Sequence, residues 1–588
     1  MEFTLAWHNP SMLLQGLDVS ITKAVRRPEF IFGLALAIFV FTSPTPTLAS
    51  SDCPSLTEAD FSKRPDWFPK TCCARAWNRK VGRPYIFDYE KYGQSENHEG
   101  ERYLRFLSDS LKANSVPRDQ CFKKWTVLIA MDGDSDLYPY SLWDISEMEA
   151  RFGRYYSTRN VRAGSTLRKD VLVQHQGVED DIARRFHIFE SPREYNPDRI
   201  RSDFEKGGEL ASIHNVLSPI VEAHSIQEER FDSKSKRFSD FLKWGMRKYP
   251  SQHYMVIYWG HGKGWMIKDE SGKAHLSGLE LRDALKEVAE AHDGLQSKGR
   301  IDNFVADACY MQGIETATEV SNYVRYISGS AQIQSFLGLP YRTLFYEMDS
   351  SFPALRKASD WLPKTEVLKR GSSAWSYEPT VVGKLLPILM SKHVSENGYG
   401  GRIDRAMMEA DLEALGNREA LTFSTLDGLE LQRSVIPKLE RLAGDLEKLI
   451  ETKETTEERA EIAGSILDRI WKLKTFKTSA ESRELGSFLA ILRGFGASFD
   501  QKIDSLLNSI DKATVYSLFG NRYDKSDGFR ALNVWLPKNK RSYQDSIVDF
   551  SALEGFKSPN IKDEKVNVFG NVDSNWHKFL NTVFEYGE

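Results

Sequence analysis

Short runs of strand-forming residues alternate with helical stretches between residues 120 and 330 of the chain. The runs are 125–131, 170–176, 253–259, 301–307 and 324–330. Apolar residues recur at helical spacing between them, at 233–249, 277–291 and 312–323. Apolar strands that alternate with helices are typical of a parallel sheet whose two faces are both covered. We therefore predict an α/β sandwich with a mostly parallel sheet over residues 121–380.

The pattern changes to mainly helical spacing from about residue 380. Leu439, Leu442, Leu446 and Ile450 fall on one face of a predicted helix, and similar stripes follow further along the chain. The segment 531–537 has the composition of a late strand. We predict that 381–588 is a helix-rich C-terminal extension that closes with this strand.

The N-terminal residues resemble an export signal. Lys23, Arg26 and Arg27 precede an uncharged apolar run at 30–41, and small residues follow it. The run is shorter than the roughly 20 apolar residues that span a bilayer. We predict a signal peptide over 1–50, no stable membrane span after its removal, and a periplasmic or extracellular protein. The alternative is a buried hydrophobic segment.

Residues 51–120 are rich in proline, arginine and aromatic residues and show little periodicity, so we interpret them as a lead-in or pro-segment. Four of the five cysteines lie at or near this segment, and the fifth stands far from them. They are Cys53, Cys72, Cys73, Cys121 and Cys309. In an oxidising compartment the first four allow three disulfide pairings, among which the sequence does not choose. Cys309 is then the odd thiol.

Composition and charge exclude several functional classes. A net charge of −4 on 588 residues does not favour a nucleic-acid partner. Cys72 and Cys73 lack zinc-ligand spacing, and no HExxH pattern occurs. Lys263 is followed by Gly264 rather than Ser or Thr, which excludes a phosphate-binding loop. We therefore expect chemistry that needs no cofactor and no metal.

Three aspartates, Asp132, Asp134 and Asp136, alternate directly after the first predicted strand. They resemble the start of an EF-hand loop. Leu137 stands where that loop needs Gly and Trp143 where it needs Glu, which excludes an EF-hand. A less regular calcium site and a solvated acidic turn both stay open.

Two of the predicted strands each end near a residue with nucleophilic or acid–base chemistry. His261 follows the strand 253–259, and Cys309 follows the strand 301–307. The histidine precedes the cysteine by 48 residues, which is the caspase order and spacing. Strand ends of a parallel sheet share one edge, so a thiol and a base can meet there. A helix that begins directly after Cys309 would favour its thiolate. The alternatives are a buried structural cysteine and a turn histidine without a role.

These segments resemble the clostripain family, cysteine endopeptidases of the caspase-like clan. The likeness is most specific at the His-Gly element 258–265 and the Asp-Ala-Cys element 307–311 with Glu315. Weaker likeness covers the rest of 121–588, at 125–137, 240–244, 249–250, 484–488, 532–537 and 576–580. Ala331 and Gln332 stand where the family often carries an acidic residue, which leaves the detailed shape of the pocket open but not the chemistry.

The resemblance implies a caspase-like fold and assigns a role to each site residue. Cys309 would be the nucleophile and His261 the acid–base group. The backbone amides of Gly262 and Cys309 would hold the oxyanion, and Asp307 would select Arg or Lys before the cleaved bond. Clan members act through a dyad, so no third orienting residue is named.

The resemblance further implies activation by a cut in the segment between His261 and Cys309. We expect that cut at the Lys273–Ala274 bond, in a polar stretch that contains glycine. Two other classes stay open: a non-catalytic relative that binds basic peptides in the same pocket, and a structural surface protein in which Cys309 is buried.

Overall fold

The structure is a computed structural model of the 588-residue chain. Every residue described here belongs to the compact unit Ala49–Glu588. The described residues are 123–149, 164–165, 169–178, 181–189, 213, 216–228, 233–249, 251–262, 266–268, 274–291, 299–334, 338–349, 378–394, 422–473, 482–519, 525–544 and 574–587.

The predicted signal segment, the lead-in, Cys53, Cys72, Cys73, Cys121 and Lys273 lie outside the described residues. Among the helices that are described, none is long and apolar enough to cross a membrane.

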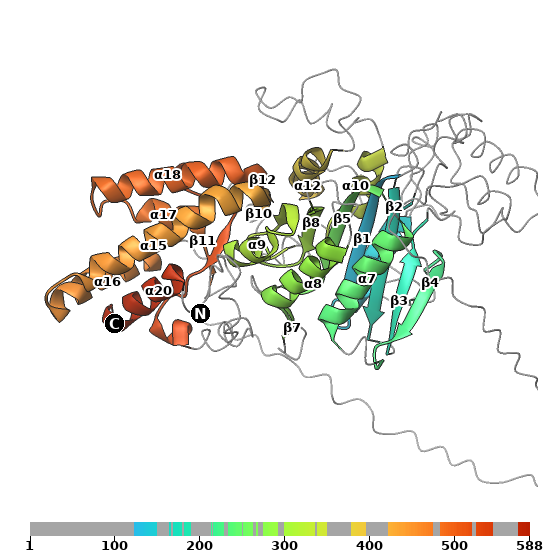
Figure 1. Cartoon of the computed structure of the whole chain (residues 1–588), viewed down its shortest axis with the longest axis horizontal. Coiled ribbons are helices and arrows are strands. Elements are labelled where there is room, and N and C mark those ends of the chain that lie inside the picture. The colour runs from blue at the N-terminus through green and yellow to red at the C-terminus, as the bar shows by residue number, and fades with distance from the viewer. Residues whose placement is uncertain are drawn as a thin grey trace, which may run out of the picture. The chain divides into compact units, whose positions relative to one another are not determined.

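A nine-stranded sheet forms the centre of the described chain, in the order β12-β10-β9-β8-β5-β1-β2-β3-β4 (Figure 1). Its strands are β1 (Lys123–Gly133), β2 (Lys169–Gly177), β3 (Ile182–His187), β4 (Ile220–Ser225), β5 (Ser251–Trp259), β8 (Ile301–Asp307), β9 (Val324–Gly329), β10 (Thr422–Asp427) and β12 (Thr514–Phe519). The five central strands, from β2 to β9, pair in parallel, and the outer pairs are antiparallel. All five predicted strands coincide with these central strands, so the predicted parallel sheet is confirmed.

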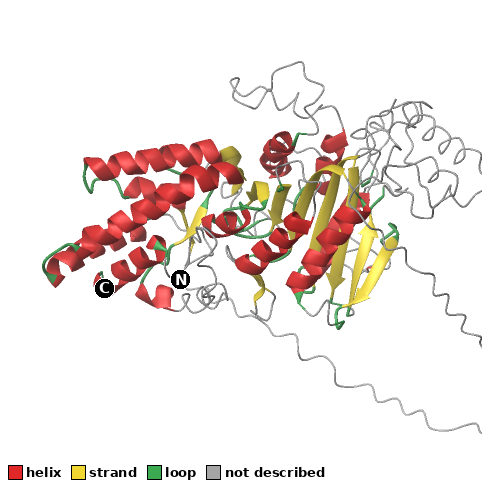
Figure 2. Cartoon of the chain, in the orientation of Figure 1, coloured by secondary structure: helices red, strands yellow, loops and turns green. Residues whose placement is uncertain are grey.

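Helices cover both faces of the sheet (Figure 2). One face packs against α7 (Lys234–Lys248), α8 (Gly278–Ala291) and α9 (Ile314–Val320), and the other against α5 (Tyr138–Glu149), α10 (Tyr341–Asp349) and α12 (Pro379–Val394). Alternate residues of β5 serve the two layers: Val256 and Tyr258 join the first, Ile257 and Trp259 the second. Because both faces are apolar, the strand appears in the sequence as one continuous apolar run.

The C-terminal region is mainly helical, as predicted, with α15 (Ile436–Glu451), α16 (Thr456–Lys472), α17 (Leu485–Ile491), α18 (Ala497–Ala513) and α20 (Asn575–Tyr586). A helical turn, α14 (Gly428–Glu430), and a π-helical turn, Leu431–Val435, lead into α15. α15 packs against α16, α18 and α20, and its apolar stripe continues the core beneath α7, α8 and α9. The sequence did not predict that β10 and β12 of this region would extend the main sheet.

The predicted late strand 531–537 contains β13 (Asn533–Trp535), which pairs with β11 (Ser482–Glu484) in a separate two-stranded sheet. β13 fastens this region to the chain just after Cys309. The Trp535 N–H donates to Glu315 at 2.7 Å, and the Asn533 side-chain amide donates to the Tyr310 carbonyl at 2.8 Å. Glu315 is buried, and burial raises the pKa of its carboxyl to about 7.

Candidate active site

The pairing of β5 with β8 determines where His261 and Cys309 lie. Trp259 pairs with Asp307 at the carboxyl end of the two parallel strands, and the Gly260 N–H extends the pairing to the Asp307 carbonyl at 3.3 Å. His261 and Cys309 each follow two residues beyond this last pair, at the same edge of the sheet. Ligands bind at that edge in open parallel sheets.

Gly262 lets the turn after His261 pack directly onto the Cys309 backbone. A Cβ atom at Gly262 would collide with the Cys309 carbonyl oxygen and lie 2.7 Å from the Met311 Cγ and 3.1 Å from the Ala308 Cβ. Two of these three neighbours are backbone or a short side chain, which have little room to move. Only glycine therefore allows the two strand ends to approach this closely.

Cys309 sits in a tight turn that precedes α9. Tyr310 has a φ of 60°, which is uncommon for a residue with a side chain. Its N–H donates to the Gln332 carbonyl at 2.9 Å, and Gln312 N–H donates to the Ser330 carbonyl at 3.0 Å. The helix predicted to begin directly after Cys309 therefore begins only at Ile314. That expectation was wrong, because Tyr310 leaves the helical region and the chain pairs with 330–332 instead.

Cys309 is half-buried. The Gln334 N–H donates to its sulfur at 3.4 Å. A backbone donor aimed at the sulfur favours the thiolate over the thiol, because hydrogen bonds to the charged form stabilise it. The thiol packs beside Tyr310, Ala331 and Phe529.

His261 is half-exposed, and its Nε2 lies 2.6 Å from the Asp136 Oδ1. Asp136 belongs to the loop between β1 and α5, the strand and helix that precede β5 in the chain. Because β1 pairs directly with β5, with Met131 opposite Trp259, this loop meets the turn that carries His261. The sequence singled out the three alternating aspartates but did not connect them with His261.

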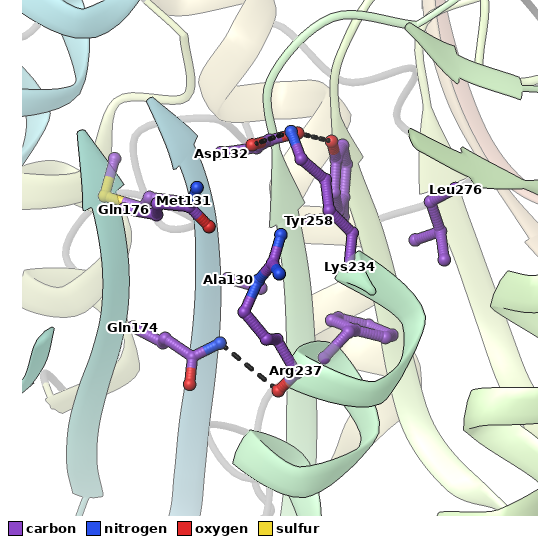
Figure 3. A pocket seen from close by; sticks show the side chains of 10 residues that line it. Ala130, Met131, Asp132, Gln174, Gln176, Lys234, Arg237, Tyr258 and Leu276 are labelled. Atoms are coloured by element: carbon purple, nitrogen blue, oxygen red, sulfur yellow. Dashed lines mark hydrogen bonds and ion pairs between the residues drawn. The ribbon is translucent and has the colours of Figure 1, made fainter. Parts of the chain in front are cut away.

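The first two alternating aspartates hold a lysine, Lys234. Figure 3 shows its contact with Asp132. The Lys234 Nζ lies 2.5 Å from the Asp132 Oδ1 and 2.8 Å from the Asp134 Oδ1, and the Tyr258 hydroxyl donates to Asp132 at 3.0 Å. The lysine ammonium is the cation that lies between the two carboxylates. It lies beside a small pocket lined by residues of β1, β2, β5 and α7. No group of three or more His, Cys, Asp or Glu side chains within the described ranges is placed to hold a metal ion.

Asp307 lies beneath this edge with only 5% of its surface exposed. The Leu339 N–H and the Tyr341 hydroxyl donate to its Oδ2 at 3.0 and 2.7 Å, and the Gln334 side-chain amide donates to its Oδ1. Burial raises the pKa of Asp307 to about 7, and the Tyr341 and Leu339 donors act in the opposite direction. Asp307 therefore changes its charge near neutral pH.

A second buried carboxyl, Asp144 of α5, faces Asp307. A Cβ atom at Gly338, whose φ is +60°, would lie 2.8 Å from the Asp307 Oδ2 and 2.9 Å from the Asp144 Oδ2. Burial, and then repulsion from Asp307 and Glu147, raise the pKa of Asp144 well above its usual value. The Trp259 indole N–H donates to the Asp144 Oδ2 at 2.6 Å. In the part of the chain that the structure describes, neither Asp307 nor Asp144 forms an ion pair.

Ala274 is the first residue of β7 (Ala274–Ser277), which pairs with β6 (Met266–Lys268). Ala274 lies opposite Lys268 in this hairpin, so the connection that contains Lys273 joins two short strands.

The structure brings His261, Gly262, Asp307 and Cys309 to one edge of the sheet. Sequence reasoning missed Asp144 and Gln334, for which the sequence carried no signal. It singled out Asp136, which follows a strand of the sheet, but did not connect it with His261.

Comparison with known proteins gives a match to the family model described as the clostripain family, over residues 129–569. No curated protein matches the sequence closely enough to count as a relative.

Two similar solved structures are a secreted C11 cysteine protease from Bacteroides thetaiotaomicron bound to an irreversible peptide inhibitor and an inactive zymogen C11 protease from Parabacteroides distasonis. The first is 14% identical, with a TM-score of 0.42, and the match covers 74% of this chain and 99% of that one. The second is 16% identical, with a TM-score of 0.43, and the match covers 75% and 99%.

The close packing of Gly262 predicts that Gly262→Ala destabilises the protein by about 1–3 kcal/mol, because the methyl group forces the two strand ends apart. Gly464→Ala is the matched control: Gly464 lies inside α16 with nothing within 4 Å of its added Cβ, so alanine should stabilise by up to about 1 kcal/mol. Denaturant unfolding measures both. A Gly262→Ala protein as stable as the wild type would show that the two turns do not pack as described.

Proposed function

Because the chain belongs to the clostripain family, and is therefore a cysteine peptidase, we propose that it is an exported endopeptidase that cleaves after Arg or Lys with Cys309 and His261 as its dyad. The observation that carries this proposal is the register of β5 and β8, which brings the two side chains to one edge of the sheet. The half-buried position of Cys309 and the backbone donor on its sulfur support the same assignment.

The proposed reaction has two steps. The Cys309 thiolate attacks the carbonyl carbon of the peptide bond, and the C–N bond breaks as protonated His261 gives its proton to the leaving amine. A water molecule then loses a proton to His261, and its oxygen displaces the sulfur to release the acid. The amides of Gly262 and Cys309 would stabilise the negative charge on the carbonyl oxygen in both steps. The contact of Gly262 with the Cys309 backbone supports this pairing of donors.

The proposed preference for Arg and Lys rests on the two carboxyls beneath the site. Asp307 and Asp144 face each other in a buried environment, and neither forms an ion pair with a described residue. A cationic side chain that enters here would relieve their mutual repulsion and form a charge-assisted hydrogen bond. The Gln334 side-chain amide donates a hydrogen bond to the Asp307 Oδ1. A substrate cation that took its place would replace this neutral donor with a charged one.

We further propose that the enzyme activates itself by cutting the Lys273–Ala274 bond. A lysine before this bond suits the proposed specificity. The bond lies where the β6–β7 hairpin begins its second strand, between the turn of His261 and the helix α8. A cut there releases the connection from its hairpin without breaking a strand of the main sheet.

The dyad predicts that Cys309→Ala abolishes hydrolysis of fluorogenic peptides with Arg or Lys before the reporter, while the melting temperature stays close to that of the wild type. The thermal stability should hold because the change removes one sulfur atom from a half-buried position. His261→Ala should lose nearly as much activity. A Cys309→Ala protein that keeps more than a few per cent of the rate would show that another group is the nucleophile.

Self-activation predicts a new N-terminus at Ala274 in the purified wild type and an uncut chain in Cys309→Ala. Gel electrophoresis and N-terminal sequencing detect the cut. Lys273→Gln is the control: it keeps Cys309 but lacks the lysine before the bond, so its chain should stay uncut. A fully active wild type that runs as one uncut chain would contradict the proposal. Equal cutting of Cys309→Ala would show that a different protease makes the cut.

The pKa of Asp307 predicts a specificity that depends on pH. The carboxyl is neutral below about pH 7 and charged above it, so attraction for a cation grows as the pH rises. The ratio of kcat/KM for an Arg peptide to that for its citrulline analogue should rise roughly tenfold from pH 6 to pH 8, as the ionised fraction does. Ionisation of the dyad cancels in this ratio.

Asp307→Asn is the control for this pH dependence. It should show a low ratio that does not change between pH 6 and pH 8, because the amide carries no charge at either pH. A wild-type ratio that stays constant across this range, or equal cleavage after Arg and citrulline, would rule out Asp307 as the group that recognises the cation.

A further inference from the structure

The loop that follows β1 carries three aspartates, and the structure divides them between two tasks. We call residues 132–136 the acidic loop. Asp132 and Asp134 bind Lys234, and Asp136 reaches the turn after β5, where its Oδ1 lies 2.6 Å from the His261 Nε2. An aspartate this close to a proposed acid–base histidine is placed to orient the imidazole ring.

The acidic loop is held from three directions. Lys234 reaches it from α7, the Tyr258 hydroxyl donates to it from β5, and the Gln176 side-chain amide donates to Asp134 at 3.2 Å from β2. Ser135, directly before Asp136, is buried, and its carbonyl accepts the N–H of Tyr138, two residues after Asp136, at 3.0 Å. The backbone that carries Asp136 is therefore fastened on both sides, so its carboxylate is presented from a defined position.

We propose that Asp136 is a positioning residue for His261. The carboxylate accepts the Nε2–H and leaves Nδ1 as the ring nitrogen that exchanges a proton with Cys309 and with the leaving amine. This inference rests on the proposed function, because it gives His261 the acid–base role. The Asp136 carboxylate, from the β1–α5 loop, would be an orienting group in addition to the two residues of the dyad.

The exposure of the pair separates a positioning role from a structural one. The side chain of His261 is 33% exposed and that of Asp136 is 56% exposed. An ion pair in such contact with water adds little to folding stability. Ring orientation still matters to proton transfer, since a small misplacement of an acid–base group lowers the rate of the chemical step. Loss of Asp136 therefore lowers kcat while the melting temperature stays the same.

The first experiment compares Asp136→Ala and Asp136→Asn with the wild type on an Arg fluorogenic peptide. Alanine removes the acceptor and should lower kcat about tenfold with KM within about twofold. Asparagine keeps an oxygen that can accept the Nε2–H, so it should recover part of that loss. Asp181→Ala is the matched control, because Asp181 is also an exposed loop aspartate that accepts one side-chain hydrogen bond, from Gln227, and it should leave kcat unchanged.

The second experiment adds Asp136→Ala to a His261→Ala protein. If Asp136 acts through His261, the residual rate of His261→Ala should not fall further. A further tenfold fall would overturn the inference, and so would a full kcat in Asp136→Ala. Equal losses in Asp136→Ala and Asp181→Ala would also overturn it.

The proposed function fails in a different way, which the same assays reveal. If activity persists in Cys309→Ala, or if the wild type lacks activity altogether, the dyad is wrong and this inference falls with it. If activity depends on Cys309 and His261 but not on Asp136, only the inference is overturned.

Discussion

The parallel pairing of β5 with β8 is the constraint on which the site depends. Hydrogen bonds between the two strands place Trp259 opposite Asp307, and every later position follows from that register. A slip of one residue would turn each side chain to the other face of the sheet, because side chains alternate along a strand. His261 would then no longer lie at the same level as Cys309. Both strands are buried along almost their whole length, so a shifted register would have to repack the layers on both faces.

The turns beyond these strands are determined by contacts from distant parts of the chain. Asn533 bonds the carbonyls of Tyr310 and Ala331, and Glu315 bonds the backbone of Trp535. A strained φ at Tyr310 persists only where its surroundings hold it, and here the C-terminal region supplies part of that support. The C-terminal region is therefore part of the structure that holds the candidate site, since it also contributes β10 and β12 to the sheet that carries the site.

Much of this arrangement could be predicted from the sequence, because its strongest signals are local. Each central strand is a run of apolar residues, and the runs ending near His261 and Cys309 place both residues at strand ends. The order of the strands within the sheet could not be predicted from such local signals. The pairing of β1 with β5, which brings Asp136 to His261, is a property of the folded sheet. Asp144 and Gln334 reach Asp307 through contacts between segments far apart in the chain, for which no local pattern exists.

The central claim is that Cys309 is the nucleophile and that the carboxyl of Asp307 beside it attracts a substrate cation. An arginine chloromethyl ketone tests both parts at once, because its side chain seeks the carboxyl and its reactive carbon alkylates the thiolate. Peptide mapping by mass spectrometry after labelling should find one reagent per chain, on Cys309, with a much slower reaction in Asp307→Asn. Labelling spread over Cys53, Cys72, Cys73 and Cys121, or an active enzyme whose Cys309 stays unmodified, would contradict the account.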